Sequence, residues 1–230
     1  MARGASAPGG RLPRGQESAM TDAEMVNDAL WSKGRRGVVE INERLEPAGF
    51  VIGNGVVLLP APGFMKDGRV EDATLSVPDE GEDALALQLE VRLLPEGDGP
   101  SEHARLLDRW EAYHGRRGAA RFMVGVAQAA RLGNAVVDGE ELSVVNTLGN
   151  EPALLRRLNA DRAALARGVK RLTGNEAFEP TAVGVDQRGV DVRTRTGVFR
   201  VPGPRGKQLD DDGAAAMVSE LLMSGGAARD

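Results

Sequence analysis

The sequence predicts an α+β protein, in which antiparallel strands and helices share the chain. From residue 84 to residue 94, apolar residues alternate with polar or small ones, as in a strand with one buried face. Gly53-Asn54-Gly55 separates two apolar runs, and an Asn-Gly pair favours a tight β-hairpin. Residues 151–173 carry apolar side chains at helical spacing, so we expect one amphipathic helix to organise the second half.

Composition limits the class of protein. The 230 residues are 41% hydrophobic, enough for a packed core in one or two domains. A net charge of −5 argues against coating nucleic acid through bulk charge, and the absence of cysteine excludes disulfides, thiolate metal sites and cysteine nucleophiles. No apolar run approaches the roughly 20 residues of a membrane span, and the amino terminus lacks a signal-peptide core. We therefore expect a soluble, cytoplasmic, bacterial protein.

The first half is expected to begin with a disordered tail. Residues 1–19 are rich in Gly, Pro, Ser and Arg, and Met20 is a second candidate start. Residues 21–45 suggest two helical pieces broken near residues 34–37. Strands are then expected at 50–52, 56–59, 70–77 and 84–94, which would form an antiparallel meander in an amino-terminal α+β domain, residues 20–95.

The second half, residues 101–224, follows a Pro- and Gly-rich run at 95–100 that is the best candidate domain boundary. The two halves could equally form one continuous domain. The helices expected before the organising helix are one from Ser101, burying Leu106, Leu107, Trp110 and Tyr113, and one over residues 119–132. Strands are expected at 142–145, 182–186, 190–194 and 198–201, and a last helix at 214–223.

The organising helix has readable ends and two different faces. Asn150 can cap its first amides, and Gly174 can supply a left-handed exit. Its predicted buried stripe is Leu154, Leu155, Leu158, Leu165, Val169 and Leu172. Its outer face is basic, and we take its cations as candidate partner-binding residues: Arg156, Arg157, Arg167, Lys170 and Arg171.

A search for catalytic, cofactor-binding and metal-binding motifs predicts none. Gly206-Lys207 lacks the earlier Gly and the following Ser or Thr of a phosphate-binding loop. His103 and His114 would lie about 16 Å apart on one helix, too far for one metal, and are expected at the surface or in an interface. The acidic run at residues 210–212 is best explained as a complement to a helix dipole.

Two stretches resemble known families. Residues 110–185 combine a Trp-bearing helix, a second helix, the strand GEELSVV and a helix ending LTGN. This order resembles the carboxy-terminal interaction region of the bacterial DNA polymerase III tau/gamma subunit. That resemblance implies a protein-interaction role in a complex that handles nucleic acid, although the nucleotide-binding module of that family is missing.

The second resemblance covers residues 158–202, with the runs LNAD at 158–161, VGVDQRGVD at 183–191 and FRVP at 199–202. These runs are similar to the small domain appended to split barrels in haem-utilisation proteins. That family places His after the Asn-x-Asp, where this chain has Arg162. The resemblance implies association with haem or flavin.

Because the motif search predicts no site for chemistry, the leading hypothesis is a non-catalytic binding or adaptor protein that needs no cofactor. Its expected partner is another protein; nucleic acid is a less favoured partner and a membrane is not expected. The alternative is a haem- or flavin-associated protein or enzyme of the split-barrel type. The oligomeric state stays open.

Overall fold

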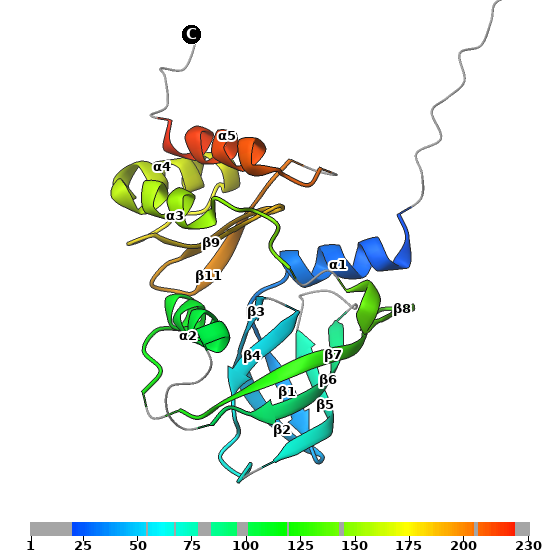
Figure 1. The fold of residues 1–230 in the computed structure, drawn as a ribbon. Coiled ribbons are helices and arrows are strands. Elements are labelled where there is room, and N and C mark those ends of the chain that lie inside the picture. Colours follow the sequence, from blue (N-terminus) through cyan, green and yellow to red (C-terminus); the bar gives the residue numbers. More distant parts are fainter. Residues whose placement is uncertain are drawn as a thin grey trace, which may run out of the picture.

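The computed structural model describes residues 20–53, 55–66, 68–77, 84–95, 101–118, 120–142, 145–204 and 207–223. It contains a curled antiparallel sheet, here called the barrel sheet, and a smaller unit of three strands and three helices (Figure 1). The predicted α+β class is confirmed. The predicted tail at residues 1–19 lies outside the described residues.

The first helix, α1 (Asp22–Ser32), begins at a capping box. The Thr21 hydroxyl accepts a hydrogen bond from the Glu24 backbone, and the Glu24 carboxylate accepts one from the Thr21 backbone. The second helical piece predicted before residue 45 is wrong. Those residues form strands β1 (Arg36–Ile41) and β2 (Arg44–Gly49), because β-branched side chains alternate there and bury one face of β1.

The remaining strands of the barrel sheet are β3 (Val51–Gly53), β4 (Val56–Pro60), β5 (Arg69–Val77), β6 (Leu85–Leu93), β7 (Phe122–Leu132) and β8 (Ala135–Asp138). Their order is β2-β1-β5-β6-β7-β4-β3, with β8 on β7 and every pair antiparallel. The predicted hairpin is confirmed by the Ile52 and Val57 pair, although Asn54 lies outside the described residues.

The barrel sheet curls around an apolar core. Its inner side chains include Ile41, Leu59, Leu89 and Met123, each at most 1% exposed. Helix α1 covers one open end of the curl and adds Leu30 to this core (Figure 1).

The helix predicted at residues 119–132 is wrong, because β7 occupies this stretch and pairs with both β6 and β4. The strand predicted at 142–145 is not found at Leu142 or Val145; a short 3-10 helix, η1 (Gly139–Glu141), precedes it, and residues 143–144 lie outside the described residues. The barrel sheet therefore takes strands from both sides of residues 96–100. The domain limits 20–95 and 101–224 remain a prediction.

Helix α2 (Ser101–His114) lies between the barrel sheet and the smaller unit (Figure 1). Its predicted stripe is confirmed: Leu106, Trp110 and Tyr113 are buried, and Leu107 is half-buried. The Trp110 ring meets the Phe122 ring edge-on, with centroids 5.0 Å apart. The same apolar cluster reaches Val183 of the smaller unit, so α2 joins the two parts.

The smaller unit, here called the C-terminal unit, contains β9 (Thr181–Asp186), β10 (Gly189–Arg193) and β11 (Val198–Pro202), close to the predicted strands. Helices α3 (Glu151–Ala160), α4 (Arg162–Thr173) and α5 (Asp211–Leu222) cover one face of this sheet. Leu158, Leu165 and Val190 are fully buried in the core between the helices and the sheet.

The prediction of a single organising helix is wrong, because residues 151–173 form two helices, α3 and α4. Asp161 breaks the chain at φ −131° and ψ 84°, and its carboxylate accepts a hydrogen bond from the Ala164 backbone at 2.8 Å. Gly174 has the predicted left-handed exit, at φ 76°, but the Asn150 side chain does not cap α3. Leu172, predicted to be buried, is 41% exposed. None of the described helices is long and apolar enough to cross a membrane.

Candidate functional site: a cleft between α1 and the C-terminal unit

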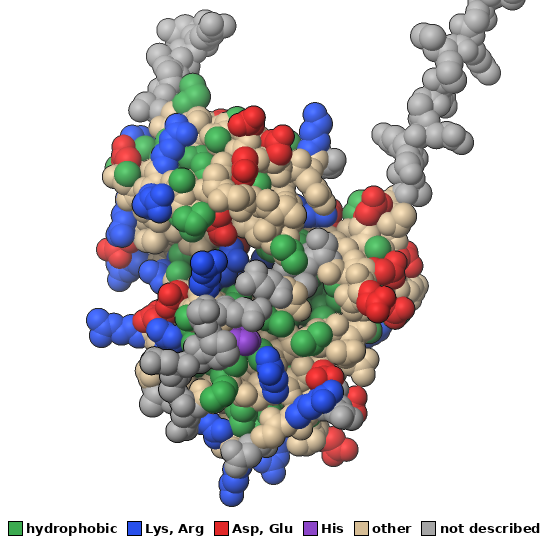
Figure 2. Space-filling model, viewed as in Figure 1, with side chains coloured by type: hydrophobic (Ala, Val, Ile, Leu, Met, Phe, Trp, Pro, Cys, Tyr) green, Lys and Arg blue, Asp and Glu red, His purple; other side chains and the backbone are tan. Residues whose placement is uncertain are grey.

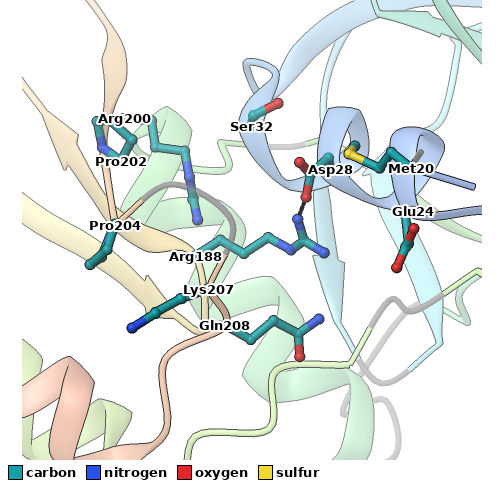
Figure 3. A pocket seen from close by; sticks show the side chains of 11 residues that line it. Met20, Glu24, Asp28, Ser32, Arg188, Arg200, Pro202, Pro204, Lys207 and Gln208 are labelled. Carbon is teal, nitrogen blue, oxygen red and sulfur yellow. Dashed lines mark ion pairs between the residues drawn. The ribbon is translucent and has the colours of Figure 1, made fainter. Parts of the chain in front are cut away.

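A cleft of about 540 Å³ lies where α1 faces the C-terminal unit (Figure 3). Helix α1 contributes the carboxylates of Glu24 and Asp28. The C-terminal unit contributes the cations of Arg188, Arg200 and Lys207. One wall of the cleft is therefore acidic and the opposite wall is basic.

Arg188 reaches the cleft because a tight turn joins β9 to β10. The Asp186 carboxylate accepts a hydrogen bond from the Arg188 backbone at 2.7 Å. Gly189 follows at φ 154°, and a Cβ there would overlap the Val201 carbonyl oxygen. The Arg188 carbonyl in turn accepts a hydrogen bond from the Gly203 backbone at 2.7 Å, so the turn is fixed against the next segment of the cleft wall.

The Arg188 side chain spans the cleft and forms an ion pair with Asp28 (Figure 3). Burial and the nearby Arg200 both lower the pKa of Arg188 from its ordinary value, although the group stays charged. Its Nε atom is buried and has no hydrogen-bond partner among the described residues. Arg188 therefore retains an unsatisfied donor, which an acceptor in the cleft could reach if the side chain moved from its position against Asp28.

Arg200 is already committed to internal partners. Its guanidinium pairs with Asp186 and, at 3.0 Å, with Asp191, and both acidic residues are at most 5% exposed. Burial alone would lower the pKa of Arg200, but these two carboxylates raise it above its ordinary value. Asp191 also accepts a hydrogen bond from the Tyr113 hydroxyl at 2.6 Å; burial and this carboxylate raise the pKa of Tyr113. This buried network fixes the floor of the cleft and ties it to α2.

Lys207 and Glu24 line the cleft as exposed residues, and the Lys207 ammonium points away from the Arg188 guanidinium (Figure 3). The Lys207 ammonium has no ion pair within the part of the chain that the structure describes. Hydrogen bonds from the backbone and hydroxyl of Thr21 lower the pKa of Glu24, so its carboxylate stays anionic. An incoming anion would thus meet attraction on the C-terminal unit and repulsion on α1.

The five cations predicted as partner-binding residues lie apart from the cleft. All five are exposed, on α3 for Arg156 and Arg157 and on α4 for the others. In Figure 2, Lys and Arg side chains gather over α4 at the upper left. Lys170 pairs with Glu176, and Arg171 donates to the Glu220 and Met223 carbonyls at the end of α5. Their role in binding a partner remains a prediction.

The histidines differ in part from their prediction. His103 is 6% exposed, so it is a buried residue rather than a surface one. His114 lies between α2 and the link from β2 to β3, where its ring centroid is 4.9 Å from that of Trp110 and its Nε2 is 3.0 Å from the Phe50 carbonyl oxygen. No group of His, Asp and Glu within the described ranges could hold a metal ion.

Sequence reasoning missed the cleft. From the sequence, Lys207 was weighed only as part of a phosphate-binding loop. Arg188 and Arg200 were placed only in the runs that resemble haem-utilisation proteins. A weak signal was present, since Asp186, Asp191 and Arg200 stand on strands where apolar residues would be expected to fill the interior.

The comparisons with known proteins give a fold but no family. No protein-family model and no curated protein matches the chain. Among solved structures, the chain is similar to a protein of unknown function from Agrobacterium tumefaciens, with 14% identity, 93% of this chain and 100% of that chain covered, and a TM-score of 0.62. The two proteins therefore share a fold.

Two further solved structures match more loosely. A heme binding protein from Mycobacterium smegmatis has 18% identity, with 88% of this chain and 96% of that chain covered and a TM-score of 0.40. A protein from Listeria innocua, assigned as a candidate pyridoxamine 5′-phosphate oxidase, has 16% identity, with 50% and 100% covered and a TM-score of 0.37. At these TM-scores neither likeness bears on ligand or function.

The structure itself separates the two resemblances found in the sequence. A curled antiparallel sheet followed by a small αβ unit agrees with the architecture implied by the split-barrel resemblance. The resemblance to the tau/gamma subunit required a second helix over residues 119–132 and a strand at 139–145. The chain instead forms β7 and η1 there, so the basis for that resemblance is lost.

Proposed function

We propose that this protein is a small-molecule-binding protein of the split-barrel type, which holds an anionic group of its ligand in the cleft between α1 and the C-terminal unit. The observation that carries the proposal is the buried, unpartnered Nε of Arg188 in the cleft wall. A guanidinium presents its donors as a planar fork that matches the oxygens of a carboxylate or phosphate. The volume, about 540 Å³, falls within the range of small-molecule sites.

Lys207 supports the same proposal from the edge of the cleft. Its ammonium is exposed and stands on the same wall as Arg188. Arg200 supplies a third positive charge behind them, although its own hydrogen bonds go to Asp186 and Asp191. We therefore expect Arg188 to bind the anion directly, Lys207 to add attraction, and Arg200 to hold the wall in place.

The split-barrel resemblance suggests haem or flavin as a cofactor. Only the anionic groups of these cofactors fit the described lining of the cleft. Haem iron is usually held by His, Cys, Met or Tyr, and Met20 is the one residue of these types among the described lining residues. No aromatic side chain among them offers a stacking surface for a flavin ring. The described cleft does not fit haem, and the proposal is limited to the anionic group of the ligand.

The proposal is tested by titrating the protein with phenyl phosphate and with benzoate while recording amide NMR shifts. We expect shifts around Glu24, Arg188 and Lys207 with at least one probe. Arg188→Gln should weaken binding about tenfold, because a charged hydrogen bond is worth about 1.5–3 kcal/mol, and Lys207→Gln about two- to fivefold.

Lys66→Gln is the matched control, since Lys66 is an exposed lysine on the barrel side. It should leave binding unchanged. Shifts that avoid the cleft, or no shift with either probe, would overturn the proposal.

Absorbance of the purified protein separates this proposal from the cofactor alternative. A Soret or flavin band in amounts equal to the chain would favour a haem- or flavin-associated protein. A colourless protein that releases an anionic small molecule on denaturation, identified by mass spectrometry, would favour the cleft proposal.

A further inference from the structure

We infer that the anionic group which the cleft binds is a phosphate rather than a carboxylate, because Asp28 of α1 is a carboxylate already tethered opposite Arg188. This inference rests on the proposed function and specifies the chemical class of its ligand. Three observations on the cleft carry it: the Arg188 and Asp28 ion pair, the unpartnered Nε of Arg188, and the exposed ammonium of Lys207.

The ion pair is the starting point. The Asp28 side chain is 48% exposed and that of Arg188 is 22% exposed, so the pair lies at the solvent side of the cleft and can exchange. A partner tethered within the same molecule acts at an effective concentration of about millimolar or above. A free ligand with a single carboxylate would offer Arg188 the same chemistry as Asp28 without that advantage. It would therefore compete poorly.

A phosphate monoester differs from Asp28 in charge and in geometry. Above its second pKa of about 6 it carries nearly two negative charges and three acceptor oxygens. One oxygen can satisfy the Nε of Arg188 while a second accepts from a terminal guanidinium nitrogen, and the positive charge of Lys207 on the same wall adds attraction. Asp28 leaves the Nε unsatisfied, so the phosphate gains a hydrogen bond that the internal carboxylate does not make.

Asp28 also affects the bound phosphate, because it competes with the phosphate for Arg188. When the phosphate takes Arg188, the carboxylates of Asp28 and Glu24 face it across the cleft and oppose it. Asp28 is thus an intramolecular competitor for Arg188, and it lowers the apparent affinity of the cleft for anions. Removing its charge should strengthen anion binding, whereas a residue that positioned Arg188 would weaken binding when removed.

The test compares phenyl phosphate with benzoate, which share the ring and differ in the anionic group, at about pH 7.5, above the second phosphate pKa of about 6. Calorimetry on the full chain is expected to give about tenfold tighter binding of phenyl phosphate. Asp28→Asn should tighten the binding of both probes about two- to fivefold, the value of a partly exposed ion pair.

Two controls complete the experiment. Asp22→Asn removes the same charge from the exposed first turn of α1 and should change neither affinity. In the background of Arg188→Gln, Asp28→Asn should no longer tighten anion binding, because the guanidinium for which Asp28 and the ligand compete is absent.

Three outcomes distinguish a failure of the phosphate assignment from a failure of the proposed function. Benzoate binding as tightly as phenyl phosphate would overturn the phosphate assignment. An Asp28→Asn variant that binds phenyl phosphate no better than the parent would overturn the role of Asp28 as a competitor. If the parent and the Asp28→Asn variant bind neither probe, the proposed function itself fails.

Discussion

At the scale of single residues, the least usual feature is the charge buried beneath the cleft. Asp186 and Asp191 are buried, the side chain of Arg200 is 10% exposed, and each charge has a hydrogen-bonded partner of opposite sign. Such a network is no proof of high stability, since an apolar replacement of the whole set can be equally stable. Its partial removal is different, because an unpaired buried charge is strongly unfavourable.

Arg200→Met should therefore destabilise the protein by about 3–5 kcal/mol, because it leaves two buried carboxylates without their cation. The matched control is Arg195→Met, at the exposed turn between β10 and β11, which should change stability by no more than about 0.5 kcal/mol. Urea unfolding followed by circular dichroism measures both. Equal effects of the two substitutions would contradict a structural role for the network.

At the scale of elements, α4 and α5 meet through a glycine. A Cβ built on Gly168 would overlap the Leu221 carbonyl oxygen, so the two helices approach closely at this point. The approach also brings Arg171 to the end of α5, where it donates to the Met223 carbonyl at 2.9 Å.

Gly168→Ala should destabilise the C-terminal unit by about 1–3 kcal/mol, although alanine is the better helix former, because the helices would have to separate. Gly63→Ala is the control, since Gly63 is exposed with no atom near the added methyl group, and should be close to neutral. Thermal unfolding distinguishes them. A Gly168→Ala variant as stable as the parent would mean that the helices do not need this contact distance.

The elements also show where the sequence was sufficient. Hairpin chemistry and period-2 alternation predicted β3 to β6, and a Gly exit predicted the end of α4. The stretch at 122–132 fits helical spacing as well as strand spacing, and only its pairing with β4 and β6 decides between them. Asp161 breaks a continuous helical pattern through one side-chain cap, which periodicity cannot detect.

The cleft was harder to predict, for a related reason. Glu24 and Asp28 are separated from Arg188 by most of the chain, and each alone looks like an ordinary surface charge. Only the placement of the C-terminal unit opposite α1 brings them together. The polar network beneath is equally non-local, since Tyr113 of α2 meets Asp191 of β10.

At the scale of the whole molecule, α2 holds the two parts together. The Arg109 guanidinium pairs with Glu151 of α3 at 2.6 Å, and the Arg193 side chain donates to the Ala112 carbonyl at 2.6 Å. Together with the Tyr113 hydrogen bond, these contacts fix the C-terminal unit on one face and leave the outer sides of α3 and α4 open. The cleft and the basic surface of α3 and α4 are thus separate, and a ligand and a partner could bind independently.

The adaptor hypothesis from the sequence is testable on that basic surface. Arg171 serves the end of α5 and Lys170 is paired, so the cations suited to a partner are Arg156, Arg157 and Arg167. Replacing these three with Ser should weaken association with an acidic partner, found by tagged pull-down and mass spectrometry, and flatten its salt dependence. For duplex DNA the salt slope should fall by about 0.9 for each lost phosphate contact. Lys207→Gln, which alters the cleft alone, should leave partner binding intact; if the triple variant binds every candidate partner as the parent does, the surface has no such role.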